Sequence, residues 1–349
     1  MNNLARELNV ESVGVNLSFY QETPGVFRSP HTVSVFSWET SLSDFGVVRY
    51  MNWMMTNGSN VVHKYPDYLS SWDYSGGAWN SFGGVPLEFI LDTVSISDTT
   101  PWINIPHLAS DEAILDMGHR IFRSGVEKTF LVEFSNETWN WSMPQFESIN
   151  KGGINYLSTQ YDRLMHTKSL LDTTGIDAKY ILGSHFYGYR DAKWYLKVGP
   201  IPKDLPGVDA IAVGPYMGTK RQNERATNMA EMELLMEHEW NNHFVPALYE
   251  WADIAHDSGV PLIAYESGLH IVGPKAPLRA NIDALEYNRS EEAAKWCTRL
   301  VDEWNLVTDN DILCWFNLAS RYHGNHAWGL IDTNDMSKSH KFYAIKEYL

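Results

Sequence analysis

The residues best suited to chemistry lie in the stretch 129–140, which reads TFLVEFSNETWN. A β-branched and aromatic run ends there in Asn136 and Glu137, and Trp139 and Trp141 follow closely. A buried strand would thus carry an amide and a carboxyl group to one of its ends, beside indole rings. A carboxyl can move a proton, an amide can hold a hydroxyl, and indole faces suit a sugar ring. The alternative is a strand that ends in a solvated polar turn.

A second carboxyl of the same kind is Glu266, in the stretch GVPLIAYESG. A short apolar run again ends in Glu, which follows Tyr265 and precedes small residues that leave the carboxylate accessible. Glycoside hydrolysis usually takes two carboxyl groups, one as acid/base and the other as nucleophile or base. The two stretches therefore support each other as halves of one site.

Eight short apolar runs predict the strands that would position these groups, and amphipathic stretches between them predict helices. The runs are residues 12–17, 47–51, 102–105, 129–134, 179–183, 210–214, 261–265 and 312–316; the helical stretches include 111–124, 155–173, 229–258 and 290–304. Hydrophobic strands that alternate with helices indicate a parallel sheet covered by helices. Eight such units suit a (β/α)8 TIM barrel, with a doubly wound open sheet as the alternative. In a closed barrel the fourth and seventh strands, which end in Glu137 and Glu266, face each other across the mouth.

Two long irregular segments, residues 18–40 and 57–86, follow the carboxyl ends of predicted strands. A barrel carries its active site at that face, so they predict extended loops there with a functional role. The alternative is that they only cover the mouth. No linker, low-complexity tract or repeat interrupts the sequence, and residues 1–349 are expected to form a single catalytic domain.

Composition narrows the possible partners. The chain has 349 residues, of which 44% are hydrophobic and 20% charged, and its formal net charge is −16. That charge argues against general binding of nucleic acid or of anionic membranes. Aromatic residues reach 13%, with 14 Trp, which suits sugar stacking or a large barrel core. Cys297 and Cys314 lie in apolar contexts and are expected to be buried thiols.

The N-terminal stretch MNNLARELNVESVGV has no basic segment followed by an apolar one, so no signal peptide is predicted. No apolar run approaches the ~20 residues that span a membrane. A cytoplasmic enzyme, a viral product and a leaderless form of a secreted enzyme all fit this pattern. No cofactor is predicted.

The motifs FSNETWN and IAYESG, on predicted strands four and seven, resemble the paired signatures of clan A glycoside hydrolases, a group of retaining (β/α)8 enzymes. The resemblance extends over about residues 13–329, and its most specific part is the Asn-Glu pair followed by Trp. It implies that Glu137 is the acid/base, that Glu266 is the nucleophile, and that Asn136 binds the sugar 2-hydroxyl. It does not assign a subfamily.

The resemblance also implies support for the nucleophile. Arg49, in VVRYMNW on strand two, occupies the place of an Arg that supports it, and Tyr216, in AVGPYMG after strand six, that of a Tyr that hydrogen-bonds it. Both groups would favour the ionised form of Glu266. Arg49 could instead be a structural ion pair, and Tyr216 could only cap a loop.

Four further residues are expected to contact substrate. The resemblance implies that Trp315, at the end of strand eight, forms the floor of the sugar-binding site. It also implies that His107, at the end of strand three, binds substrate. Trp139 lies beside the carboxyl pair, where an apolar neighbour raises the pKa of Glu137. His323 lies just after strand eight. The alternatives are a core position for Trp315, a turn-closing role for His107 and a loop position for His323.

These expectations combine into a retaining glycosidase that cleaves a β-linked oligo- or polysaccharide by double displacement, with an endo-type cleft favoured by the aromatic loops. One rival is a non-catalytic carbohydrate-binding barrel. Another is a barrel aldolase or metal-dependent hydrolase, which would need a strand-end Lys or a His/Asp cluster. The stretch HEWNNH, from His238 to His243, resembles a zinc helix, but its five-residue spacing is expected to separate the two imidazoles, so no metal is predicted.

Overall fold

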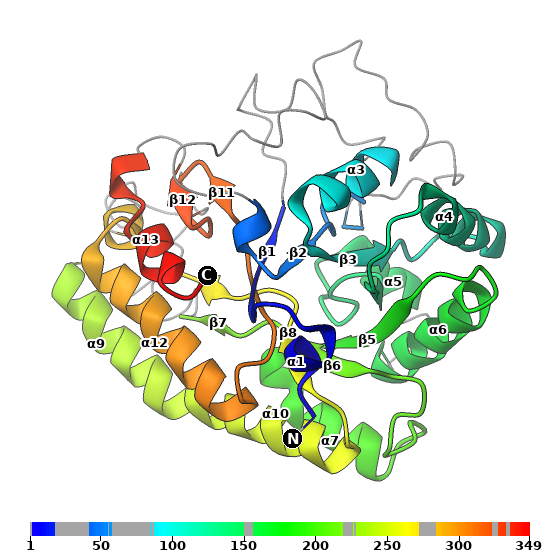
Figure 1. Cartoon of the computed structure of the whole chain (residues 1–349). Helices are drawn as coiled ribbons and strands as arrows, with labels where there is room; N and C mark the ends of the chain where they lie inside the picture. Colours follow the sequence, from blue (N-terminus) through cyan, green and yellow to red (C-terminus); the bar gives the residue numbers. More distant parts are fainter. Residues whose placement is uncertain are drawn as a thin grey trace.

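The computed structural model describes residues 2–17, 42–54, 56–57, 85, 87–149, 156–218, 226, 228–271, 284–322, 327–332 and 336–349. Eight parallel strands close into a barrel in the order β1-β10-β8-β6-β5-β4-β3-β2. Helices surround the strands (Figure 1). The predicted (β/α)8 barrel is thereby confirmed, and the open sheet is excluded because β1 pairs with both β2 and β10.

The barrel strands are β1 (Val13–Asn16), β2 (Val47–Arg49), β3 (Thr100–Ile105), β4 (Phe130–Phe134), β5 (Ala178–Ser184), β6 (Ala210–Val213), β8 (Leu262–Ala264) and β10 (Leu313–Trp315). Each of the eight predicted strands coincides with one of them to within two residues at either end. Two short parallel pairs lie outside the barrel: β7 (Tyr216–Met217) with β9 (Gly268–Leu269), and β11 (Ala319–Ser320) with β12 (Ile331–Asp332).

The helices are α1 (Leu4–Leu8), α3 (Leu87–Ser97), α4 (Asp111–Ser124), α5 (Pro144–Ile149), α6 (Tyr156–Leu171), α7 (Tyr189–Lys197), α9 (Met229–Glu239), α10 (Val245–Ser258), α12 (Glu291–Thr308) and α13 (His340–Lys346). A π-helical turn, Trp240–Phe244, joins α9 to α10. The four predicted helical stretches are confirmed as α4, α6, α9 with α10, and α12. The sequence pattern did not single out α3, because that helix buries residues on almost every side.

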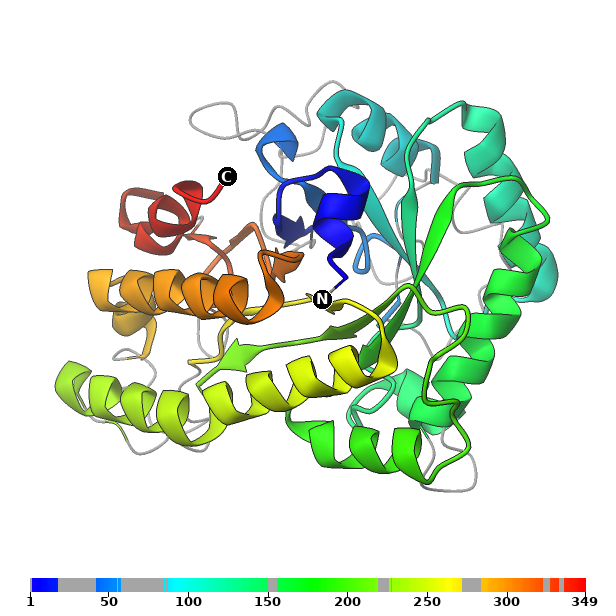
Figure 2. The same cartoon turned by 60° about the horizontal axis from the view of Figure 1, so that its bottom comes forward.

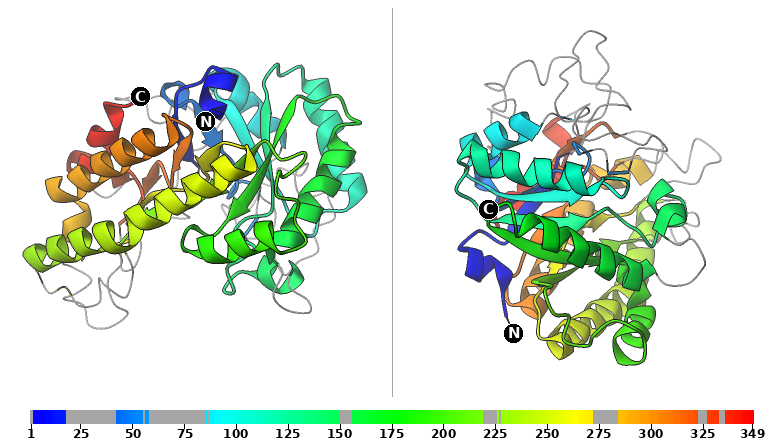
Figure 3. Two further views of the ribbon diagram at one scale, coloured as in Figure 1. Left: turned by 90° about the horizontal axis from the view of Figure 1, so that it is seen from below. Right: turned by 90° about the vertical axis from the view of Figure 1, so that its right-hand side faces the viewer.

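Side chains set the ends of several helices. Ser110 precedes α4 and accepts a hydrogen bond from the backbone N–H of Ala113, and Ser290 does the same for Ala293 in α12. Gly125 ends α4 in the left-handed conformation, with φ of 73°, which Gly adopts without a steric penalty. Figure 2 and the left view of Figure 3 show α12 lying beside α10, and the right view of Figure 3 shows α4 beside α6. Within the described part of the chain, every helix is too short or too polar to cross a membrane.

The barrel interior is apolar at its N-terminal end and polar at its mouth. The buried apolar side chains that fill it are Val47, Trp102, Leu131, Ile181, Ala210, Ala212, Ile263, Tyr265, Ile312 and Cys314. Leu4 and Ala5 of α1 join this cluster and close the N-terminal end. Two residues further along three of the strands, alternation brings Arg49, Asn104 and Glu133 to the inside. Both cysteines are buried and free.

Candidate active site

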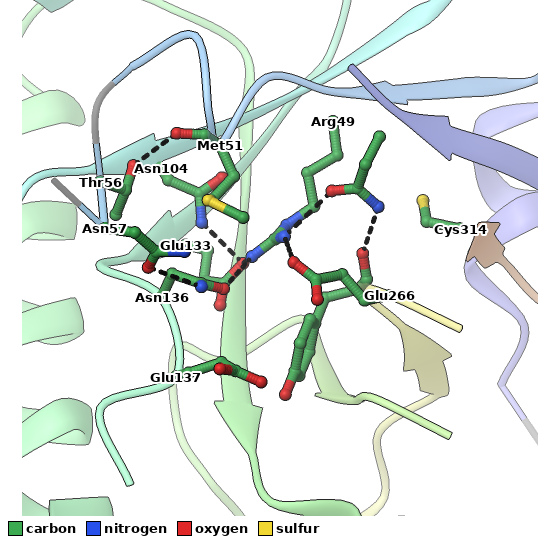
Figure 4. A network of polar contacts seen from close by, with 12 residues as sticks. Arg49, Met51, Thr56, Asn57, Asn104, Glu133, Asn136, Glu137, Glu266 and Cys314 are labelled. Carbon is green, nitrogen blue, oxygen red and sulfur yellow. Dashed lines mark hydrogen bonds and ion pairs between the residues drawn. The ribbon is translucent and has the colours of Figure 1, made fainter. Parts of the chain in front are cut away.

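Arg49 is the centre of a buried polar network at the carboxyl ends of the strands (Figure 4). Its Nη1 donates to Glu266 Oε1 at 2.9 Å and to Asn16 Oδ1 at 3.1 Å. Its Nη2 donates to Glu133 Oε2 at 2.7 Å and to Asn136 Oδ1 at 2.8 Å. Burial alone would lower the pKa of Arg49, but the charges of Glu133 and Glu266 raise it above its ordinary value. Arg49 therefore holds a permanent positive charge beneath the mouth.

Glu266 follows β8, and side chains hold both of its oxygens. Arg49 donates to Oε1, and the Tyr216 hydroxyl donates to Oε2 at 2.8 Å. The pairing of β7 with β9 places Tyr216 opposite Gly268, which brings the phenol over the carboxylate. Burial raises the pKa of Glu266, and Arg49 and Tyr216 oppose that shift. The structure thus brings Glu266 together with the two residues, Arg49 and Tyr216, that the sequence predicts beside it.

The turn after β4 has an unusual backbone. Ser135 and Glu137 adopt left-handed conformations, with φ of 62° and 42°, which cost free energy for residues other than Gly. Two amide side chains hold the turn in place. Asn104 Nδ2 donates to the Ser135 carbonyl at 2.7 Å, and Gln145 Nε2 donates to the Asn136 carbonyl at 2.6 Å. Such strain, held by surrounding contacts, is typical of functional sites.

Arg49 fixes the orientation of the Asn136 amide. A guanidinium only donates hydrogen bonds, so the Asn136 oxygen must face it and the amide nitrogen must face away. That nitrogen donates to Asn57 Oδ1 at 2.9 Å, and Gln145 Nε2 donates to the same oxygen at 2.9 Å. An amide nitrogen carries two N–H bonds, and Asn57 takes one of them.

Glu137 has a different environment from Glu266. Figure 4 shows the two side chains pointing toward each other from β4 and β8. The Glu137 carboxyl accepts a hydrogen bond from Asn140 Nδ2, at 2.9 Å to Oε2. Burial and then the negative charge of Glu266 raise the pKa of Glu137 to about 8. At neutral pH Glu137 therefore holds a proton, whereas Glu266 beside it has two hydrogen-bond donors that favour its ionised form.

Aromatic rings lie near both members of this carboxyl pair. Trp139 stacks on His185, at the end of β5, with ring centroids 4.1 Å apart and planes 27° apart. Burial lowers the pKa of His185 to about 4, so this imidazole is neutral at neutral pH. Near Glu266, the Phe316 ring lies 6.5 Å from that of Tyr216, which donates to Glu266, and 6.2 Å from that of Trp328.

Trp315 does not occupy the place expected of it. Its side chain is 1% exposed and belongs to the hydrophobic cluster that lies between strands and helices, together with Val13 and Leu313. A strand alternates its side chains, so Cys314 turns into the barrel and Trp315 turns away from it. The aromatic residue from strand β10 that reaches Tyr216 is therefore Phe316, one position later.

Of the two predicted histidines, His107 and His323, the structure describes only His107. Within the described residues, His107 makes no hydrogen bond to Arg49, Glu137 or Glu266. Instead burial, with a smaller contribution from the charge of Arg163 in α6, lowers the pKa of its imidazole. His323 lies outside the described residues, as do residues 18–40 and most of 57–86.

The expectation that the five-residue spacing in HEWNNH separates the two imidazoles is wrong. The rings of His238 and His243 lie 5.8 Å apart, because the π-helical turn Trp240–Phe244 is wider than an α-helical turn. Residues five apart therefore share a face there. Within the part of the chain that the structure describes, no three His, Cys, Asp or Glu side chains gather where they could hold a metal ion.

The sequence reasoning missed three residues of the network: Asn16, Asn104 and Glu133. Each is a polar residue in an otherwise apolar strand, and each is buried, with 1% of its surface exposed or less. That pattern is the signal that could have found them, because a buried polar group needs a partner.

No family model and no curated protein matches the sequence. Solved structures do match. A GH51 arabinofuranosidase from Xanthomonas axonopodis pv. citri has a TM-score of 0.57 and 12% identity, over 99% of this chain and 74% of that one. An endo-1,4-beta-xylanase from Caldicellulosiruptor owensensis has a TM-score of 0.53 and 9% identity, and a GH10 endo-beta-1,4-xylanase from Gloeophyllum trabeum 0.52 and 12%; each match covers 99% of both chains. This chain therefore shares its barrel fold with glycoside hydrolases, and the resemblance noted from the two motifs is confirmed at the level of the fold.

Proposed function

We propose that the protein is a retaining glycoside hydrolase in which Glu266 is the nucleophile and Glu137 the acid/base. The observation that carries this proposal is the unequal environment of two facing carboxyl groups. Arg49 and Tyr216 hold Glu266 as a carboxylate, whereas burial and the Glu266 charge keep a proton on Glu137. Double displacement begins from that state, with one carboxyl ionised and the other protonated.

The first step joins the sugar to the protein. Glu266 attacks the anomeric carbon while Glu137 gives its proton to the leaving oxygen, and the glycosidic bond breaks. Ester formation removes the negative charge of Glu266, so the pKa of Glu137 falls and its carboxylate becomes a base. In the second step Glu137 takes a proton from water, which attacks the same carbon and releases Glu266.

The surrounding residues suit a sugar ring. Asn136 directs its amide nitrogen away from Arg49 and keeps one N–H for the 2-hydroxyl. A hydrogen bond to that hydroxyl contributes several kcal/mol in the transition state of such enzymes. We assign the apolar platform at the end of β10 to Phe316 in place of Trp315, and a second platform to Trp139. His107 is not assigned a substrate contact.

An endo-acting cleft for a β-linked chain fits the aromatic rings near both members of the carboxyl pair. Trp141, which follows on the same loop as Glu137, is 81% exposed and offers a further face for a sugar unit. Two of the three similar structures named above are endo-xylanases, which agrees with this proposal.

An activity panel tests the function. Wild type, Glu137→Gln and Glu266→Gln are incubated with polysaccharides and aryl β-glycosides, and NMR follows the anomer released first. We expect wild type alone to hydrolyse a β-linked substrate, with retention of configuration. Release of the inverted anomer would refute the retaining mechanism. Sugar binding without hydrolysis by folded wild type would favour the non-catalytic barrel instead.

A further inference from the structure

Glu133 is a third carboxyl beneath the reacting pair, and the mechanism above gives it no part. It lies on β4, four residues before Glu137, and none of its surface is exposed. Its Oε2 accepts three N–H bonds: from Arg49 Nη2 at 2.7 Å, from Arg49 Nε at 3.2 Å and from Asn104 Nδ2 at 2.9 Å. Figure 4 shows it on the other side of the guanidinium from Glu266.

The barrel is shaped to hold this carboxyl. Gly183 on β5 faces it, and a Cβ at that position would lie only 2.8 Å from Glu133 Oε1. Any larger residue at position 183 would displace the Glu133 carboxyl. Oε1 has no hydrogen-bond partner among the described residues, so the bonding concentrates on the oxygen that faces Arg49.

The hydrogen bonds to Glu133 favour its ionised form. Burial raises its pKa, and Arg49 and Asn104 oppose that shift. A proton on Oε2 would displace one of three donors, and a proton on Oε1 would meet no acceptor. The single positive charge of Arg49 is therefore shared between two carboxylates, Glu133 and Glu266.

We propose that Glu133 is a positioning residue: its negative charge, acting across Arg49, sets the pH range in which Glu266 is ionised while Glu137 holds the proton. Without Glu133, the whole charge of Arg49 would act on the reacting pair. Glu266 would become a weaker base and nucleophile, and Glu137 would lose its proton at a lower pH. This inference rests on the proposed function, because it assigns Glu133 a part in that acid–base cycle.

The test is Glu133→Gln, which keeps the shape and removes the charge. The Gln oxygen can take the place of Oε2, so Arg49 and Asn104 keep their acceptor. We expect the acidic and basic limbs of the kcat/KM profile both to move to lower pH, by about one unit. Activity at the new optimum should fall less than about tenfold. Limbs that stay in place would overturn the proposal and leave Glu133 a structural residue.

Glu133→Asp is the second variant, should the Gln variant not fold. Asp keeps the negative charge but, being one methylene shorter, holds it farther from Arg49. Both limbs of the kcat/KM profile should therefore also move to lower pH, by a smaller amount. A lower kcat with unmoved limbs would refute the proposal. The matched control is Asp311→Asn, a buried carboxyl at the opposite end of the barrel, which should leave the limbs unchanged.

A measurement without substrate separates this proposal from the proposed function. Carbon-13 NMR of protein labelled at the glutamate carboxyl gives the pKa of Glu137, whose signal is identified by its loss in Glu137→Gln. That pKa should be lower in Glu133→Gln than in wild type, even if no substrate is ever hydrolysed. An unchanged pKa would contradict the role of Glu133, whereas an inactive wild type would contradict only the glycosidase.

Discussion

Two buried carboxyl groups at opposite ends of the barrel differ in what holds them. Asp311 precedes β10 at the N-terminal end and accepts hydrogen bonds from the backbone N–H groups of Leu4, Ala5 and Ile312, each at 2.9 Å. Glu266 follows β8 at the mouth and accepts only from side chains in the contacts above. Backbone donors are fixed by the fold, so Asp311 fastens α1 to the barrel.

Their electrostatic surroundings differ as well. Burial raises the pKa of Asp311 to about 6, and its three backbone hydrogen bonds and the charge of Arg6 oppose that shift. No neighbouring carboxyl among the described residues contributes to it. Glu266 shares Arg49 with Glu133 and faces Glu137. A buried carboxyl therefore marks a reactive site when side chains hold it and like charges surround it. A buried carboxyl stabilises the fold when backbone N–H groups alone donate to it.

The largest effect should follow Glu266→Ala. Loss of the nucleophile should lower kcat on an aryl β-glycoside on the order of 10⁵-fold, as expected when a catalytic nucleophile is removed. The melting temperature should hold or rise, because the repulsion between the Glu266 and Glu133 carboxylates disappears. Turnover assays and thermal denaturation check this pair of outcomes. Loss of both activity and stability would make Glu266 a structural residue like Asp311.

Asp311→Ala should show the reverse pattern. Three backbone N–H groups lose their acceptor, so we expect a loss of about 3 kcal/mol in the free energy of unfolding with kcat unchanged. Urea denaturation measures it.

The cost of Asp311→Ala should also depend on pH. The folded pKa of Asp311 lies above its usual 3.8, so its contribution to stability falls as pH rises from there to about 6. The cost of the substitution should therefore be greater at pH 4 than at pH 7. The control is Asp309→Ala, two residues before Asp311, which removes an exposed ion pair with Arg6. It should lower the free energy of unfolding by less than about 1 kcal/mol. An inactive Asp311→Ala of normal stability would break the comparison.

Tyr216→Phe tests whether side-chain donors set the state of Glu266. Loss of one hydrogen bond to a carboxylate should lower kcat/KM by about 10- to 100-fold. It should also move the acidic limb to higher pH, because that bond favours the ionised form of Glu266. Tyr180→Phe is the matched control, since the Tyr180 hydroxyl donates to the Asp172 carboxylate at 2.9 Å, outside the network around Arg49. If the control moves the limb equally, the assignment of Tyr216 fails.

The elements of the fold were predictable because local pattern determines them. Apolar runs gave all eight strands, and a Glu at the end of two runs pointed to Glu137 and Glu266. Parallel strands bring their carboxyl ends to one face, so two distant residues could be joined without knowing any contact.

The remaining parts of the site depend on facing and register, which the pattern of a single strand leaves open. One step of alternation exchanges Trp315 for Phe316. The pairing of β7 with β9 and the π-helical turn that joins His238 to His243 arise from tertiary packing. Glu133 was overlooked because a lone charge in an apolar run gains meaning only when its partner, here Arg49 from another strand, is known.

The smallest effect distinguishes the two carboxyl groups of the reacting pair. Glu137 has a folded pKa raised from 4.5 to about 8, so wild type loses stability as pH rises through that range, when Glu137 ionises in the folded protein. Glu137→Gln has no such charge and should be more stable than wild type at pH 9, while the two should match at pH 4. Urea denaturation at both values measures the difference. Glu147→Gln, an exposed carboxyl on α5, should show no such gain. Equal stability of Glu137→Gln and wild type at pH 9 would mean that folding does not raise the pKa of Glu137. Glu133 would then have no raised pKa to maintain.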